Sequence, residues 1–131
     1  MSLDKKILLI DDDLEFINNF GNFLERRGYE VLKAGSGSHG IEVAEKEKPD
    51  IILCDLIMID INGDEVLKHV KMSDPNVIFI MMTAYIDEKT KIKLKVLGAH
   101  SFIEKVVKFI PTEEYIRQVL KEKNAVHKDE N

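Results

Sequence analysis

Cysteine is nearly absent from this sequence, which has Cys54 alone among 131 residues. A single cysteine excludes a disulfide within the chain and is typical of a protein from a reducing compartment. No apolar run approaches the roughly 20 residues that a membrane span requires. A signal peptide is also missing, because Lys5 and Lys6 are followed at once by a short apolar run and then by acids. We therefore expect a cytoplasmic protein that makes no contact with membranes.

An excess of basic charge is missing too, since the formal net charge is −5. Domains that bind nucleic acid present a basic face, so we expect no direct contact with nucleic acid. What the sequence does have is a hydrophobic content of 44%, which is typical of a globular domain. The length suits one domain. We predict this domain over residues 5–124, with a tag or disordered start at 1–4 and a solvated tail at 125–131.

Short aliphatic runs alternate with helical segments along the chain. Strands are predicted at 6–10, 29–34, 50–54, 77–82 and 100–104, and helices at 14–27, 39–48, 64–72, 87–97 and 112–124. The segment 87–97 is ambiguous because "KIKLKVL" alternates as a strand does. We assign it to a helix, since Asp87 and Gly98 suit the two ends of a helix and a strand would break the alternation. The pattern (βα)5 predicts a doubly wound α/β fold with five parallel strands covered on both faces.

Acidic residues crowd the end of the first predicted strand. In "ILLIDDDLEF", Asp11, Asp12 and Asp13 follow four aliphatic residues, and two carboxylates about 4 Å apart repel by roughly 4 kcal/mol at an effective dielectric near 20. Asp13 is expected to cap the following helix. Asp55 follows the third strand, and ligands of such sheets bind at the carboxyl ends of the strands. The carboxylates of Asp11, Asp12 and Asp55 together predict a Mg²⁺ site.

A hydroxyl and an ammonium follow the last two strands. Thr83 follows the fourth strand and Lys105 follows the fifth, so both should reach the edge of the sheet where Asp55 lies. Each of them can hold an oxygen of a phosphoryl group, and phosphoryl transfer depends mainly on such positioning and charge neutralisation. An aspartate can attack phosphorus as a nucleophile. We therefore interpret Asp55, Thr83 and Lys105 as a site of phosphoryl transfer.

Four segments in order resemble the receiver domains of two-component response regulators: "ILLIDDD", "PDIILCDLIMIDINGDEVL", "MMTAY" and "GAHSFIEK". The resemblance covers about residues 5–124 and implies a flavodoxin-like sheet with strand order 2-1-3-4-5. It implies that Asp55 is the phosphoacceptor and that Asp11, Asp12, Asp55 and the backbone carbonyl of Ile57 hold Mg²⁺.

The resemblance also implies how the phosphoryl group is bound and sensed. Thr83 and Lys105 would bind its oxygens, while Thr83 and Phe102 would act as switch residues. A sensor histidine kinase or a phosphotransfer protein would be the donor. An output domain or docking protein would read the changed surface of the fourth helix, fifth strand and fifth helix, and the faces of these two helices would also serve a homodimer. Such a protein catalyses only its own phosphorylation and dephosphorylation. Whether it docks to a partner or belongs to a longer chain stays open.

Two prolines that are usual in the family are replaced by Ile59 and Val106. Since a cis bond before a residue other than proline costs about 3–4 kcal/mol, we predict a trans peptide between Lys105 and Val106. The segment "VVKFIP" is also longer than usual. Counting forward from Gly98 selects Lys105 as the site lysine, whereas counting back from Glu114 selects Lys108. We favour Lys105, because an insertion is easier to absorb in the loop than in the strand.

Two other functions compete with this interpretation. One is a receiver-like interaction module that takes no phosphate, which the missing prolines leave open. The other is a phosphatase of the haloacid dehalogenase type, but that family needs an acid two residues after its nucleophile, where this chain has Ile57. In the family that the sequence resembles, the positions of Ile57 and Tyr85 flank the path of the hydrolytic water. Because both side chains are large and mostly apolar, we predict a long-lived acyl phosphate.

Overall fold

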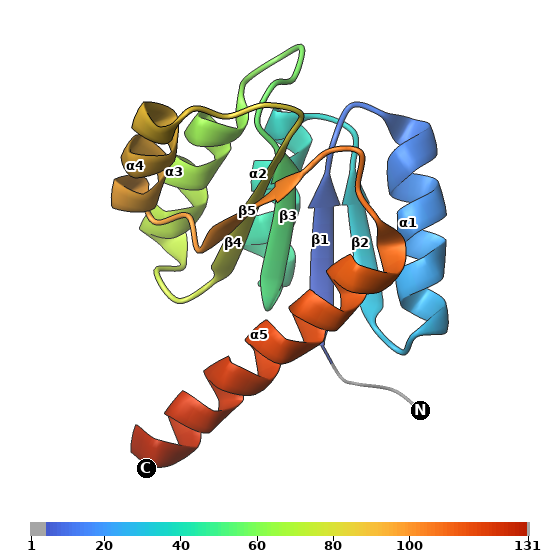
Figure 1. Cartoon of the computed structure of the whole chain (residues 1–131), viewed down its shortest axis with the longest axis vertical. Coiled ribbons are helices and arrows are strands. Elements are labelled where there is room, and N and C mark those ends of the chain that lie inside the picture. The colour runs from blue at the N-terminus through green and yellow to red at the C-terminus, as the bar shows by residue number, and fades with distance from the viewer. Residues whose placement is uncertain (1–4, 131) are drawn as a thin grey trace.

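A five-stranded parallel sheet forms the centre of the protein (Figure 1). The computed structural model describes residues 5–130, with side chains described through Asn124. The predicted start at 1–4 and Asn131 lie outside this range, as do the side chains of the predicted tail. The strands are β1 (Lys6–Ile10), β2 (Glu30–Ala34), β3 (Ile51–Asp55), β4 (Ile78–Thr83) and β5 (Ser101–Glu104). Their order is β2-β1-β3-β4-β5, which confirms the predicted topology.

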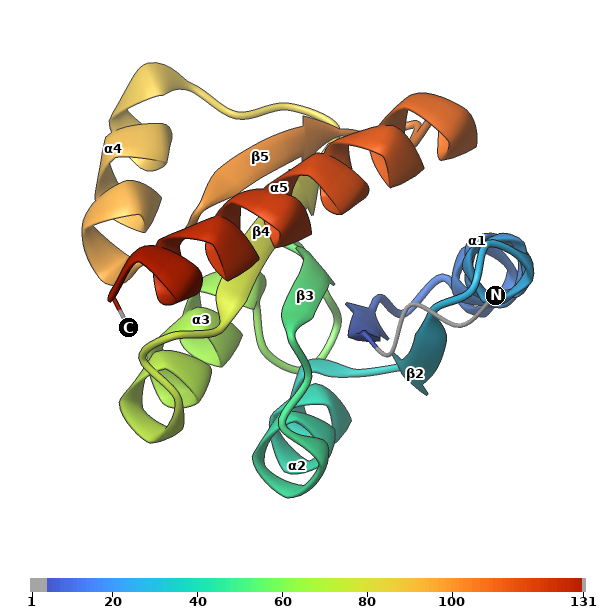
Figure 2. The ribbon, with the colours of Figure 1, turned by 90° about the horizontal axis from the view of Figure 1, so that it is seen from below.

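The three central strands, β1, β3 and β4, are largely apolar and buried because helices cover both faces of the sheet. The helices are α1 (Leu14–Arg26), α2 (Gly37–Glu47), α3 (Gly63–Ser73), α4 (Glu88–Leu97) and α5 (Phe109–Glu130). Side chains of α1 and α5 pack with Ile7, Leu9 and Leu53 on one face, and side chains of α2, α3 and α4 pack with Leu8, Ile52 and Phe79 on the other. Figure 2 shows α1 and α5 on the opposite side of the sheet from α2 and α3.

Helix ends follow the polar residues that the sequence offers. Asp13 caps α1 by accepting a hydrogen bond from Phe16 N, at 3.1 Å, as predicted. The ambiguous segment is helix α4, with Asp87 accepting from Thr90 N at 2.7 Å and Gly98 ending the helix at φ 114°. None of the helices that lie within residues 5–130 has the length and apolar composition needed to cross a membrane.

Two helices begin at least two residues earlier than expected. Helix α5 begins at Phe109 rather than at 112, because Pro111 lies in the first turn, where a missing N–H costs nothing. Helix α2 begins at Gly37 rather than at 39, with Ser36 accepting from His39 N at 3.2 Å.

The prediction of a trans peptide after Lys105 was wrong, since the Lys105–Val106 bond is cis. The sequence argument considered only the local preference of the bond. It could not include the contacts that Lys105 makes with residues far away in the sequence.

Candidate functional site

Three carboxylates converge at the carboxyl edge of the sheet. Asp11 follows β1 and is fully buried, Asp12 follows it, and Asp55 ends β3. One oxygen of each lies within 4.8 Å of the others. This arrangement matches the cluster expected from the sequence.

Lys105 provides the positive charge of this cluster. Its Nζ forms ion pairs with Asp11 Oδ2 and, at 3.3 Å, with Asp55 Oδ2. The ammonium also lies over the Phe16 ring, 5.2 Å from its centroid, a distance at which a cation and an aromatic face attract. Lys108, the other candidate, is exposed. The structure therefore brings Lys105 to the acids and leaves Lys108 at the surface.

The environment changes the acid–base properties of the site. Burial raises the pKa of Asp55, the Asp11 carboxylate raises it further, and Lys105 acts in the opposite direction. Burial lowers the pKa of Lys105, but its hydrogen bond and charge interaction with Asp11, together with Asp55, leave it above its ordinary value. Burial and the neighbouring carboxylate thus disfavour the ionised form of Asp55, whereas a bound cation would favour it.

The donor set fits Mg²⁺, which prefers hard oxygen ligands and uses few protein carboxylates. Asp11, Asp12 and Asp55 offer three such groups. Asp12 also contacts the loop between β3 and α3, since Ile59 N donates to its Oδ2 at 3.0 Å. Ile57 lies in the same loop, which rises above the sheet in Figure 1.

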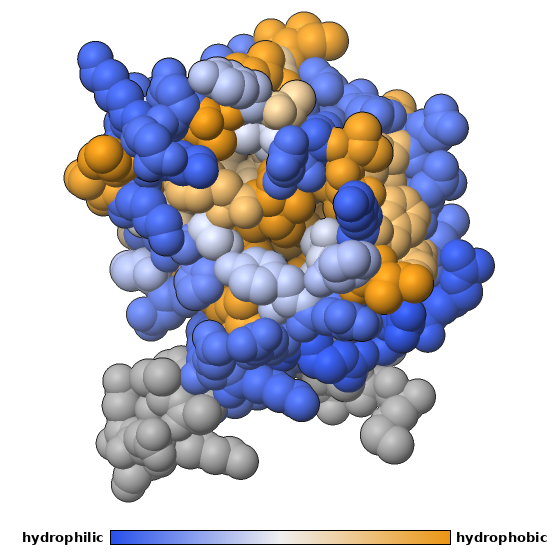
Figure 3. Space-filling model, viewed as in Figure 1, coloured by the Kyte–Doolittle hydropathy of each residue, from blue (hydrophilic) through white to orange (hydrophobic). Residues whose placement is uncertain are grey.

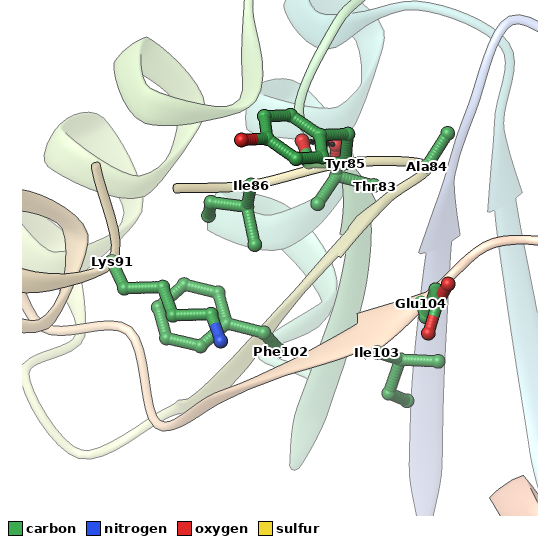
Figure 4. Close-up of a pocket in the computed structure, with 8 residues that line it drawn as sticks. All are labelled: Thr83, Ala84, Tyr85, Ile86, Lys91, Phe102, Ile103 and Glu104. Carbon is green, nitrogen blue, oxygen red and sulfur yellow. Dashed lines mark hydrogen bonds between the residues drawn. The ribbon is translucent and has the colours of Figure 1, made fainter. Parts of the chain in front are cut away.

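Thr83 and Phe102 lie at the neighbouring edge, on β4 and β5. The Thr83 hydroxyl is buried and donates to the carbonyl of Tyr85 at 3.0 Å. Both residues line a cavity of about 370 Å³ together with Ile86, Lys91 and others. Figure 4 shows Phe102 pointing away from Thr83 and toward α4, where Lys91 lies beside its ring. The predicted switch residues thus share one cavity.

Apolar side chains surround the mouth of the site. Ile57, Ile59, Tyr85 and Val106, all on loops at the carboxyl edge, are exposed. The orange area at the top of Figure 3 lies over the loop between β3 and α3. Cys54 is buried with its thiol within reach of the Asp55 carbonyl, and burial raises its pKa, so it packs rather than reacts.

Sequence reasoning missed two neighbours of the site. The Phe16 ring lies against the Lys105 ammonium. The Asp60 carboxylate accepts hydrogen bonds from the first residues of α2. No local pattern signals either contact, because each joins segments far apart in the sequence.

Comparisons with known proteins agree with this geometry. The family model for the response regulator receiver domain matches residues 7–119. The chain is 34% identical over 103 residues to the alkaline phosphatase synthesis transcriptional regulatory protein PhoP of Bacillus subtilis, covering 79% of this chain and 43% of that protein. It is 32% identical over 97 residues to sporulation initiation phosphotransferase F of the same organism, covering 74% and 78%.

A solved structure is similar along nearly its whole length. The CheY-like receiver domain protein from Methanospirillum hungatei superposes with a TM-score of 0.88 at 30% identity, covering 92% of this chain and 97% of that one. The chain spans less than half the length of the PhoP relative.

Proposed function

Because the chain belongs to the response regulator receiver family of two-component systems, we propose that Asp55 is its phosphoacceptor and that Mg²⁺ and Lys105 support the transfer. The observation that carries this proposal is the convergence of Asp11, Asp12 and Asp55 with the Lys105 ammonium. A receiver-like module that takes no phosphate is not favoured, because the acids, the hydroxyl and the ammonium all lie at the same edge. The family likewise gives no support to a phosphatase of the dehalogenase type.

In the proposed reaction, a carboxylate oxygen of Asp55 attacks the phosphorus of the donor, and the bond from phosphorus to the leaving group breaks. The product is an acyl phosphate. Asp11 and Asp12, with Asp55 and the Ile57 carbonyl, would hold Mg²⁺, which neutralises phosphoryl oxygens when bound. Lys105, which already lies 3.3 Å from Asp55 Oδ2, would transfer its hydrogen bond to one of these oxygens.

Thr83 is the residue proposed to report the modification. Its hydroxyl donates to the Tyr85 carbonyl in this structure. After phosphorylation it would turn to a phosphoryl oxygen, which carries much more negative charge than the carbonyl oxygen. Phe102 would then enter the space beside Thr83 within the cavity that both residues line. This change would alter the surface of α4, β5 and α5.

The test is mass spectrometry of the chain after incubation with acetyl phosphate. We expect the wild type to gain one phosphoryl group with Mg²⁺ and much less without it, and the matched variant Asp55→Asn to gain none. Addition of a phosphoryl group to Asp55→Asn at the wild-type rate would contradict the assignment.

The partners follow from the same proposal. A sensor histidine kinase or a phosphotransfer protein would donate the phosphoryl group, and an output domain or docking protein would bind the changed surface. Ile92 and Val96 are exposed on α4 and provide apolar contacts for such a partner or for a second copy of the chain.

A further inference from the structure

The loop between β3 and α3, residues 56–62, is held by a set of hydrogen bonds. Gly63 N donates to the Leu56 carbonyl at 2.8 Å and closes the loop. Within it, Met58 N donates to Asn62 Oδ1 at 3.1 Å. The proposed metal ligand Ile57 lies between Leu56 and Met58, which make these two hydrogen bonds. Interactions that fix the loop therefore also fix the position of the Ile57 carbonyl.

Asp60 joins this loop to another element. Its Oδ1 accepts from Gly37 N at 3.0 Å, and its Oδ2 accepts from both Ser38 N and Ser38 Oγ at 2.9 Å. Hydrogen bonds from the backbone of Ser38 and Ile61 hold the pKa of Asp60 well below its usual range. Gly37 and Ser38 begin α2, where the first N–H groups have no partner within the helix. The carboxylate satisfies two of them and also interacts favourably with the helix dipole.

The loop and the helix are in close contact at this point. A Cβ atom on Gly37 would lie 2.5 Å from Ile61 Cγ1 and 3.0 Å from the Ile61 carbonyl oxygen. Ser36 already caps α2 through His39 N. Asp60 is therefore a second cap that comes from the loop of the functional site, and it fastens that loop to a helix packed on the core.

We propose that Asp60 is a positioning residue that fastens the β3–α3 loop to α2 and thereby holds the Ile57 carbonyl ready for Mg²⁺. This role rests on the proposed function. The loop also contacts the carboxylate cluster itself, through the hydrogen bond from Ile59 N to Asp12 Oδ2. A cation that binds the Asp12 carboxylate would compete with this hydrogen bond. The Asp60 bonds then remain to hold the loop in place.

The test is a titration of the full chain with MgCl₂, followed by the amide NMR shifts of residues around Asp55. Loss of groups that orient metal ligands typically costs about 10–100-fold in metal affinity, so we expect Asp60→Ala to weaken Mg²⁺ binding by about tenfold or more. Asp60→Asn, which loses the charge but keeps an oxygen acceptor, should fall between Asp60→Ala and the wild type. Ser38→Ala removes one bond without changing charge and should weaken binding slightly.

Asp64→Asn is the matched control for charge. Asp64 lies nearby in the first turn of α3, and its Oδ1 accepts only from the adjacent Glu65 N among the hydrogen bonds of the described residues. This variant should bind Mg²⁺ within about twofold of the wild type. Equal weakening in Asp60→Ala, Asp60→Asn and Asp64→Asn would show an effect of charge alone and overturn the proposal.

Hydrogen exchange separates positioning from a purely structural role. If Asp60 served only α2, Asp60→Ala would speed exchange in the first turn of α2 and leave Mg²⁺ affinity at the wild-type level, which would overturn the proposal. If Asp60→Ala fails to fold, Asp60→Asn and Ser38→Ala provide the comparison. A wild type without any Mg²⁺ response would refute the proposed function itself, and this role with it.

Discussion

At the residue scale, the site depends on one ammonium that neutralises two acids from different strands. Lys105 is only 22% exposed and contacts both Asp11 and Asp55. The sequence placed Asp11, Asp12, Asp55 and Thr83 at this edge, because each directly follows or ends a strand. It favoured Lys105 over Lys108 as the site lysine but did not establish the choice, because spacing along an irregular loop does not determine which side chain turns inward.

The choice of lysine leads to the first prediction. We expect Lys105→Ala to slow phosphoryl uptake from acetyl phosphate by about a hundredfold or more, the usual cost of removing a donor that stabilises charge in a transition state. Lys108→Ala should leave the rate within about twofold, because Lys108 is exposed. Mass spectrometry at timed intervals measures both. The assignment fails if only Lys108→Ala loses the reaction.

A second prediction concerns the lifetime of the acyl phosphate. Ile57 and Tyr85 are exposed on the loops that follow Asp55 and Thr83, where large side chains restrict the approach of water. We expect replacement of both residues by asparagine to speed dephosphorylation by about tenfold, equivalent to about 1.4 kcal/mol in the barrier. The decay of phosphorylated protein after removal of the donor measures this rate. An unchanged half-life would contradict the idea.

At the element scale, the prediction of strands and helices from the sequence was largely confirmed, because buried aliphatic runs, Asp caps and glycine ends are local signals. Gly28, for example, follows the C-cap of α1 with φ at 104°. What the sequence did not reveal are contacts between elements. Asp60 capping α2 is one, and the burial of Glu113, which is 2% exposed on α5, is another.

Glu113 joins α5 to the turn between α1 and β2. Its Oε2 accepts from the Tyr29 hydroxyl at 2.7 Å and from Arg117 Nε at 3.0 Å. Its Oε1 lies 3.8 Å from Nη1 of Arg27. Hydrogen bonds to charged groups contribute about 1.5–3 kcal/mol each. We therefore expect Glu113→Ala to lower the free energy of unfolding by about 2 kcal/mol or more in urea denaturation.

Glu114 provides the control for this experiment, since it is the adjacent glutamate on α5 and is exposed. Glu114→Ala should change the free energy of unfolding by less than about 0.5 kcal/mol, as is usual for surface substitutions. Similar losses in the two variants would mean that the buried bonds of Glu113 contribute little to the attachment of α5.

At the scale of the whole molecule, the ionised Asp55 carboxylate disfavours the folded state when no Mg²⁺ is bound. Burial and the Asp11 carboxylate raise the pKa of Asp55 above its ordinary 3.8, so the folded chain holds this proton more tightly than the unfolded chain. Between 3.8 and the raised value, the free energy of unfolding falls as pH rises, because the unfolded state binds fewer protons there. We expect Asp55→Asn to be more stable than the wild type at pH 7 without metal, and this difference to shrink as the pH falls below that range.

Mg²⁺ should reverse this order, because a ligand that binds only the folded state stabilises it by mass action. At a Mg²⁺ concentration about 100 times the dissociation constant, the free energy of unfolding rises by about 2.7 kcal/mol. We expect urea denaturation at pH 7 to show this gain in the wild type, a much smaller one in Asp55→Asn, and its loss on addition of EDTA. The measurements without metal and with Mg²⁺ test the same charge. The Asp55 carboxylate destabilises the folded state without metal, and the same carboxylate is needed to bind Mg²⁺. An Asp55→Asn variant that is less stable than the wild type without metal, or equally stabilised by Mg²⁺, would break this link and with it the electrostatic account of the site.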